Sequence, residues 1–138
     1  MGRRRLASTL VALALAAITA ASTAGTAEAA GCGASNGTLW CGNAANAPIY
    51  DRPWIKAVGP GGPGIEVDRM WTTYSRFECW VEGALHPGDN YTWYWTQGDK
   101  YGNWGYMPAS SLNTSSDFDA HPDWHGLEKC PWNPFEGW

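Results

Sequence analysis

The clearest pattern in this chain is an alternation of side-chain types over short stretches, which is typical of β-strands. In residues 91–96 three aromatic side chains would share one face of a strand, and Thr92, Tyr94 and Thr96 would share the other. Residues 76–82 alternate in the same way, whereas no stretch repeats hydrophobic residues at helical spacing. The pattern therefore predicts an all-β fold.

Segments rich in glycine and proline separate the alternating stretches and predict the connections between strands. We expect a long loop over 52–64, a turn over 86–90, a loop over 97–103 and a tight turn over 109–111. About five short strands joined in this way predict a small closed barrel, because closing a sheet removes its exposed edges.

The alternation also predicts which side chains face the interior. The first strand of the barrel is expected at Ala47–Tyr50, with its isoleucine buried. In the next stretch Ile65 and Val67 are predicted to point inward, and Glu66 and Asp68 outward.

The chain divides into four segments by composition. Residues 1–29 are predicted to be a signal peptide, because three arginines and an uncharged apolar run precede the small-residue pattern Ala27-Glu28-Ala29. That run is too short for a stable membrane span, so we expect cleavage after Ala29 and a secreted, extracellular protein, free or associated with the cell wall. The other segments are a disulfide-closed N-terminal loop (30–46), a barrel (47–113), and an acidic loop with an aromatic C-terminal tail (114–138).

Charge restricts the partners. Without its first 29 residues the chain loses three of its nine basic residues and one of its thirteen acidic ones, so it is more acidic than the whole chain at −4. An acidic surface disfavours nucleic acid and anionic membranes, which attract lysine and arginine. We expect a monomer that binds neither nucleic acid nor membrane after signal cleavage.

Tryptophan is the most over-represented residue. All ten tryptophans follow residue 29, and a domain of this size cannot easily bury ten large side chains because its surface-to-volume ratio is high. Some should therefore be exposed and form a binding surface. The alternative is that most belong to the core or edges of a thin barrel.

The four cysteines predict two disulfides, as is usual in a small exported domain. Three pairings are possible. We favour Cys32–Cys41, which closes a short local loop, and Cys79–Cys130, which would attach the C-terminal segment to a strand.

Residues 91–112 read YTWYWTQGDKYGNWGYMPASSL and resemble the closing half of a bacterial SH3-like (SH3b) barrel. The family pattern there is W-Y-x-V, a glycine-containing turn, G-W-V and a nearby leucine. The matching residues are Trp93-Tyr94-Trp95, Gly98 to Gly102, Gly105-Tyr106-Met107 and Leu112. The resemblance covers 47–113 and extends to small secreted actinobacterial proteins of this type. It implies a disulfide-stapled SH3-like barrel that binds a ligand and is not an enzyme.

A second likeness is to eukaryotic SH3 domains. Ala47-Pro48-Ile49-Tyr50-Asp51 looks like their A-L-Y-D-Y strand, Trp93-Tyr94 like their W-W pair, and Pro108-Ala109-Ser110 like P-S-N. The likeness implies an aromatic groove suited to an extended peptide or a sugar ring. With Trp104, which stands two residues before the position of the family's second tryptophan, the candidate ligand-binding residues are Tyr50, Trp93, Trp104 and Pro108. The alternative is that these residues pack the barrel interior.

Residues 114–130 contain two histidines four apart with interleaved acids (His121, His125, Asp117, Asp119 and Asp123). Paired histidines on one helical face can bind zinc, but here proline follows the first histidine where zinc proteases have glutamate. A solvated acidic loop leading to Cys130 is the simpler interpretation. The chain has no motif for a nucleophilic serine or a phosphate-binding loop. We therefore expect no cofactor, no metal and no catalysis.

Three hypotheses of function follow. The first is a secreted, non-catalytic SH3-like module that recognises cell-wall peptide or glycan, or an extracellular protein. The second is a disulfide-stabilised enzyme inhibitor or partner protein that inserts the 52–64 loop into an enzyme. The third is a small metal-dependent hydrolase that uses His121 and His125.

Overall fold

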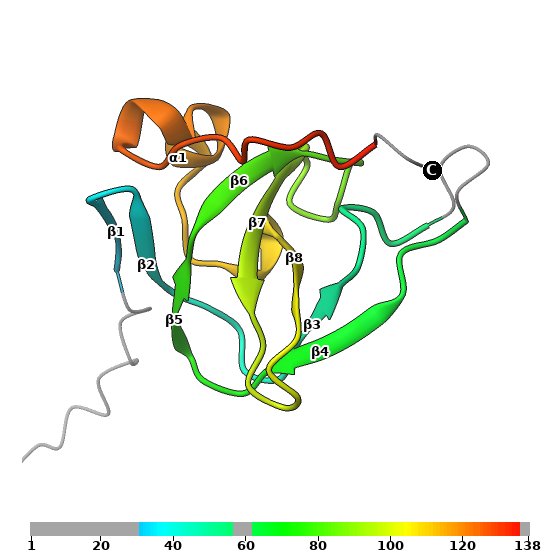
Figure 1. The fold of residues 1–138 in the computed structure, drawn as a ribbon. Helices are drawn as coiled ribbons and strands as arrows, with labels where there is room; N and C mark the ends of the chain where they lie inside the picture. Colours follow the sequence, from blue (N-terminus) through cyan, green and yellow to red (C-terminus); the bar gives the residue numbers. More distant parts are fainter. Residues whose placement is uncertain (1–30, 57–61, 136–138) are drawn as a thin grey trace, which may run out of the picture.

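The computed structural model describes residues 31–56 and 62–135, which form eight β-strands, a five-residue α-helix and two short 3-10 helices (Figure 1). The strands are β1 (Cys32–Ser35), β2 (Thr38–Gly42), β3 (Ala47–Tyr50), β4 (Glu66–Met70), β5 (Tyr74–Phe77), β6 (Cys79–Glu82), β7 (Thr92–Gln97) and β8 (Trp104–Pro108). The helical segments are η2 (Ala109–Ser111), α1 (Ser116–Ala120) and η3 (Pro122–His125). The fold is mostly β, as expected, but the prediction of an all-β fold did not include these short helical segments.

The strands form two antiparallel sheets, so the prediction of one closed barrel of about five strands is wrong. One sheet has the order β1-β2-β5 and the other β4-β3-β8-β7-β6. The division occurs at Glu78, within a stretch that the alternation predicted to be one strand. The backbone N–H of Glu78 donates to the carbonyl of Trp95 at 2.9 Å, and the chain there leaves one sheet and joins the other. Because β5 pairs with β2 while β6 pairs with β7, the described strands do not form one hydrogen-bonded sheet that closes on itself as a barrel does.

The main hydrophobic core lies between the two sheets. Leu39 of β2 and Phe77 of β5 come from the smaller sheet, and Ile49, Tyr94 and Met107 come from the larger one. All five side chains are completely buried, as the pattern predicted for Ile49. Removing this much apolar surface from water is the principal force that holds the sheets together.

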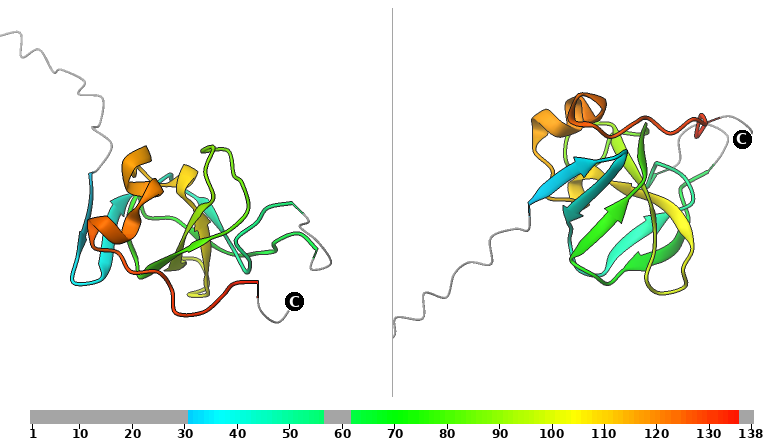
Figure 2. Two further views of the ribbon diagram at one scale, coloured as in Figure 1. Left: turned by 90° about the horizontal axis from the view of Figure 1, so that it is seen from above. Right: turned by 60° about the vertical axis from the view of Figure 1, so that its left-hand side comes forward.

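The N-terminal segment is a hairpin and not the loop predicted over 30–46. β1 and β2 pair antiparallel, and Figure 2 shows the hairpin (blue to teal) beside β5. Asn36 and Gly37 connect the strands with φ values of 53° and 76°. An Asn-Gly pair with positive φ is the preferred two-residue hairpin turn. The predicted Cys32–Cys41 disulfide is present and joins residues directly opposite each other in the ladder.

The aromatic stretch that resembles SH3b forms the predicted hairpin. β7 and β8 pair antiparallel with Gln97 opposite Trp104, and the residues between them form a loop. Pro108 ends β8, and the short η2 helix follows where the tight turn was expected. Tyr50 of β3 pairs with Tyr106 on the other edge of β8, which places β8 between β3 and β7.

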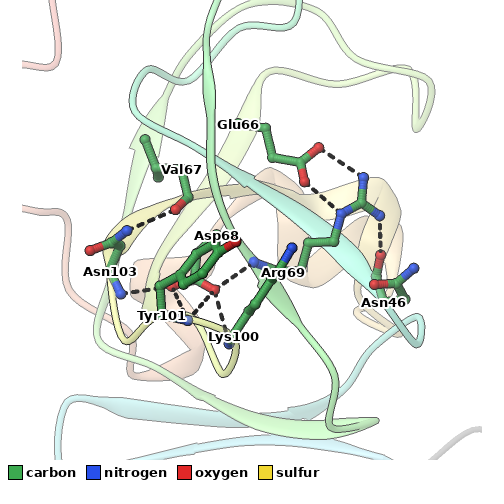
Figure 3. Close-up of polar contacts among 8 residues, drawn as sticks. All are labelled: Asn46, Glu66, Val67, Asp68, Arg69, Lys100, Tyr101 and Asn103. Carbon is green, nitrogen blue, oxygen red and sulfur yellow. Dashed lines mark hydrogen bonds and ion pairs between the residues drawn. The ribbon is translucent and has the colours of Figure 1, made fainter.

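The predicted orientation of residues 65–68 is only partly correct: Glu66 is exposed and Val67 packs against the main core as expected, but Ile65 and Asp68 are placed the other way. Ile65 is exposed, whereas Asp68 is buried at 2% exposure. The Asp68 carboxylate accepts hydrogen bonds from the backbone N–H groups of Arg69, Lys100, Tyr101 and Asn103 at 2.7–3.2 Å (Figure 3). Burial alone would raise the pKa of Asp68, but these four donors outweigh it and hold the pKa below its usual value. The inward carboxylate thereby ties β4 to the β7–β8 loop.

The C-terminal segment contains two short helical elements and is not simply the predicted acidic loop. Ser115 caps α1 by accepting a hydrogen bond from the N–H of Phe118 at 3.1 Å, and the Phe118 ring packs into the main core. The chain then passes β6, where the predicted Cys79–Cys130 disulfide anchors it. Both predicted disulfide pairings are therefore confirmed.

Parts of several predictions lie outside the described residues. These are the signal peptide (1–29), residues 57–61 of the predicted long loop, and residues 136–138 of the tail. Within the described ranges, no helix has the length and apolar character needed to cross a membrane.

Candidate functional site

Tryptophans occur both inside and on the surface of the structure. Trp54 and Trp93 are buried, and Trp80 and Trp95 are partly buried. Exposed indole rings in the described residues belong to Trp40, Trp71, Trp104, Trp124 and Trp132. The prediction that some tryptophans are exposed is confirmed.

Of the four candidate ligand-binding residues, Trp93 and Pro108 are buried opposite each other in the β7–β8 ladder. The Trp93 ring lies edge to face with Tyr50 at 6.2 Å, and its Nε1 donates to the carbonyl of Ala84 at 2.9 Å. Trp93 and Pro108 therefore belong to the interior, and Tyr50 is partly buried against the Trp93 ring. Only Trp104, at the other end of β8, is exposed.

Trp104 belongs to a stack of two indole rings. Its ring lies on that of Trp95 with centroids 6.0 Å apart and planes inclined by 19°. Trp95 is itself enclosed by Tyr106, at 4.7 Å, and by Trp132 of the C-terminal tail, at 5.3 Å. Packing from behind fixes the orientation of Trp104 and leaves its outer face to solvent.

A second stack lies on the smaller sheet. Trp40 of β2 and Tyr74 of β5 are stacked with centroids 5.8 Å apart and planes inclined by 23°. Trp40 lies directly opposite Arg76 in the β2–β5 ladder, so all three side chains share the outer face of that sheet. The inner face of the same strands carries Leu39 and Phe77.

Trp40 and Tyr74 of one stack and Trp104 of the other line one open cleft of about 560 Å³, which contains residues of both sheets. We call it the aromatic cleft and define it by Trp40, Tyr74, Arg76, Glu78, Gln97 and Trp104, which are among the residues that line it. Its volume is within the range of small-molecule sites, about 300–1,000 Å³. The cleft combines flat rings with both hydrogen-bond donors and acceptors.

The polar groups of the cleft are held in place by neighbours. Arg76 Nε lies 2.8 Å from Glu78 Oε1, and Gln97 Nε2 donates to the carbonyl of Gly102 at 2.9 Å. Asp99 Oδ2, at the cleft wall, accepts from the N–H groups of Trp71 and Thr72 and from the Thr72 hydroxyl at 2.8–2.9 Å. The side chains are thus arranged before any ligand arrives.

The C-terminal tail runs across one end of the larger sheet, near β6 and β7, as the red segment in Figures 1 and 2 shows. Trp132 Nε1 donates to the Tyr106 hydroxyl at 2.7 Å, and the Phe135 ring stacks on Trp54 at 5.2 Å. A second, smaller core lies in this part of the domain and consists of Cys79, Val81, Trp93, Tyr106 and Cys130. The described part of the tail therefore packs on the domain.

The two histidines that suggested a metal site have separate partners. His121 stacks on Trp124 at 3.6 Å, and His125 Nε2 lies 3.0 Å from Asp117 Oδ2. Asp119 is buried and accepts a hydrogen bond from the Tyr94 hydroxyl at 2.6 Å. Burial, followed by the charge of Asp119, raises the pKa of Tyr94, so the hydroxyl stays protonated as the donor. Within residues 31–56 and 62–135, no three side chains of His, Cys, Asp or Glu are grouped as metal ligands would be.

The aromatic cleft includes residues that the sequence did not identify. Trp40 and Tyr74 are 34 positions apart and meet because β2 pairs with β5, which no local pattern predicted. The surplus of tryptophan was the only signal that could have indicated them. Comparison of the chain with protein-family models, with curated proteins and with solved structures finds no significant match.

Proposed function

We propose that this chain is a secreted, non-catalytic binding module of the SH3-like type that recognises peptidoglycan, through its peptide or its glycan, in the aromatic cleft. The observation that carries the proposal is the cleft itself, in which exposed Trp40, Tyr74 and Trp104 face solvent beside a fixed Arg76–Glu78 pair. Exposed aromatic rings with polar neighbours are the usual composition of recognition sites.

The SH3-like part of the proposal is supported by the order of elements from β7 to η2. The W-Y-x-V-like segment forms β7, the glycine-containing segment forms a loop, and the G-W-V-like segment forms β8. Leu112 then follows η2 and is buried in the main core, as the leucine of that pattern would be.

Secretion is supported by the two disulfides, which fit an extracellular protein. Expression of the full chain in a Gram-positive host tests this part of the proposal. We expect the protein in the culture medium or at the cell wall, with an N-terminus at residue 30. Intracellular, uncleaved protein with reduced cysteines would contradict it.

Retention by purified peptidoglycan tests the binding function. We expect the chain that begins at residue 30 to sediment with peptidoglycan, and the variants Trp40→Ala and Trp104→Ala to lose most of that retention. Trp71→Ala and Trp124→Ala are matched controls, because both rings are exposed but do not line the cleft.

Two outcomes would contradict the proposal. One is a wild-type chain that is not retained. The other is equal loss of retention in the cleft variants and in the controls, which would indicate nonspecific adhesion of tryptophan. Recovery of the chain from medium in a stoichiometric complex with a soluble protein would instead favour an extracellular protein as the partner.

A further inference from the structure

We propose that the ligand of the aromatic cleft is an uncharged saccharide chain of at least two pyranose rings, which place their apolar faces on Trp40 and Trp104. This inference rests on the proposed function and specifies which component of the cell wall the cleft recognises. It depends on four features of the cleft: its two supported rings, its polar pair, the pairing of its backbone where β5 meets β7, and its size.

The first feature is that each exposed indole is supported by another ring. Trp40 lies on Tyr74 and Trp104 on Trp95, so each tryptophan has one face packed and the other open to solvent. The two open rings are about equally exposed, at 45% and 43%. A pyranose ring presents a flat array of C–H groups, and stacking it on a ring that is already immobilised costs little conformational entropy.

The second feature is the pair Arg76 and Glu78. The guanidinium group supplies several donors in a fixed plane and the carboxylate supplies acceptors, so together they can bind neighbouring sugar hydroxyls, each of which both donates and accepts. Because the two charges neutralise each other, the pair offers no net charge to an ionic ligand. Asp99, the other acid at the cleft wall, already accepts three hydrogen bonds at one oxygen. The cleft therefore suits a neutral, hydroxyl-rich ligand better than a polyanion.

The third feature concerns the backbone. A peptide commonly binds by adding a strand to a free sheet edge, where main-chain groups are unpaired. Along this cleft the Arg76 carbonyl accepts from the Thr96 hydroxyl at 2.7 Å, and the Glu78 N–H donates to Trp95. These two backbone groups, where β5 meets β7, are thus already paired, which favours recognition by side chains over strand addition.

The fourth feature is size. A cleft of about 560 Å³ that reaches from one sheet to the other is larger than a single ring needs. Because the two tryptophans belong to different sheets, a saccharide chain that contacts both should bind more tightly than a monosaccharide that contacts one.

Titration calorimetry with defined probes tests this inference. The chain beginning at residue 30 would be titrated with the tetramer of β-1,4-linked N-acetylglucosamine, with cellotetraose, with monomeric N-acetylglucosamine, and with stem peptide freed from glycan by an amidase. We expect saturable binding of at least one tetrasaccharide, with about tenfold weaker binding of the monomer and of the variants Trp40→Ala and Trp104→Ala. Trp124→Ala should bind as the wild type does.

The outcomes separate this inference from the proposed function. If the chain sediments with peptidoglycan but binds only the stem peptide, or binds no tetrasaccharide, the saccharide assignment is overturned and the proposed function stands. If neither peptidoglycan nor any probe is bound, both fail.

Far-ultraviolet circular dichroism and thiol titration establish that each variant is folded with its disulfides intact. Arg76→Lys supplies a second test, because it keeps the charge but not the planar donor set, and should also weaken tetrasaccharide binding.

Discussion

At the scale of single residues, Asp68 is the position in β4 where the alternation predicted the wrong face. A carboxylate in an alternating stretch is normally assigned to the solvent face, but here four backbone N–H groups, three of them from the β7–β8 loop, compensate its burial. The loop approaches so closely that a Cβ atom on Gly98 would overlap the Asp68 carboxyl group. Neither the donors nor this approach is visible in the local sequence around residue 68.

Replacing the Asp68 carboxylate should therefore destabilise the domain. In Asp68→Asn an NH₂ group would face backbone N–H donors, and at least one buried donor would lose its acceptor. We expect the free energy of unfolding in urea to fall by about 1–3 kcal/mol. The exposed Asp123→Asn is the control and should change it by less than about 0.5 kcal/mol.

The same carboxylate should make stability depend on pH. Its pKa is lowered in the folded state, so the folded protein holds fewer protons than the unfolded chain, in which an aspartate titrates near about 3.9. The stabilisation is present above that value and is lost as the pH falls through the folded pKa. The difference in urea midpoint between wild type and Asp68→Asn should therefore shrink from pH 5 to pH 2.5. A constant difference would show that the Asp68 charge does not contribute.

At the scale of elements, alternation was a reliable guide where a turn signal agreed with it, and was less reliable alone. The β7–β8 hairpin was predicted because aromatic alternation and a glycine-containing loop agree. The β1–β2 hairpin was missed because its glycine, alanine and serine residues indicated a loop, although Asn36-Gly37 is a recognised hairpin signal. The α1 helix has five residues, which is too short for helical periodicity to be visible.

The candidate site was only partly predictable, because local patterns in the sequence identify one of its strands and not the pairing that brings the others to it. Trp104 was identified from its place in the β7–β8 pattern, and it does line the cleft. Trp40 and Tyr74 reach the cleft through pairing between β2 and β5, which are separated by two other strands in the sequence. Long-range pairing of this kind is determined by the packing of the whole core.

The C-terminal tail should influence the cleft without contacting the ligand. Trp132 packs against Trp95, which in turn supports Trp104. Loss of one aromatic contact costs about 0.5–1.5 kcal/mol, so Trp132→Ala should loosen Trp104 and weaken retention by peptidoglycan by about two- to tenfold. Phe135→Ala is the matched control, because Phe135 stacks on Trp54. Equal effects of the two variants in the retention assay would indicate general destabilisation and not support of Trp104.

At the scale of the whole molecule, both the packing of two sheets and two disulfides stabilise a small domain. Cys32–Cys41 spans 9 residues within one hairpin, whereas Cys79–Cys130 spans 51 and joins the larger sheet to the tail. In the chain-entropy model a longer closed loop restricts the unfolded state more. The pairings could be predicted from spacing, but the two-sheet arrangement that they connect could not.

Removal of each disulfide should reflect this difference. The double variant Cys79→Ser/Cys130→Ser should lose about 4 kcal/mol of unfolding free energy, and Cys32→Ser/Cys41→Ser about 2.5 kcal/mol. Urea titrations of the two variants under the same conditions measure the comparison. A larger loss from the short loop would mean that the N-terminal hairpin contributes contacts beyond chain entropy.

The central claim is that Trp40 and Trp104, from different sheets, form one binding site. Nuclear magnetic resonance of the indole Nε1–H signals tests it most directly, with soluble peptidoglycan fragments as the ligand. The account predicts that the signals of Trp40 and Trp104 shift together with one saturation curve, while those of Trp71 and Trp124 stay in place. Shifts confined to Trp71 or Trp124, or separate saturation curves for Trp40 and Trp104, would contradict it.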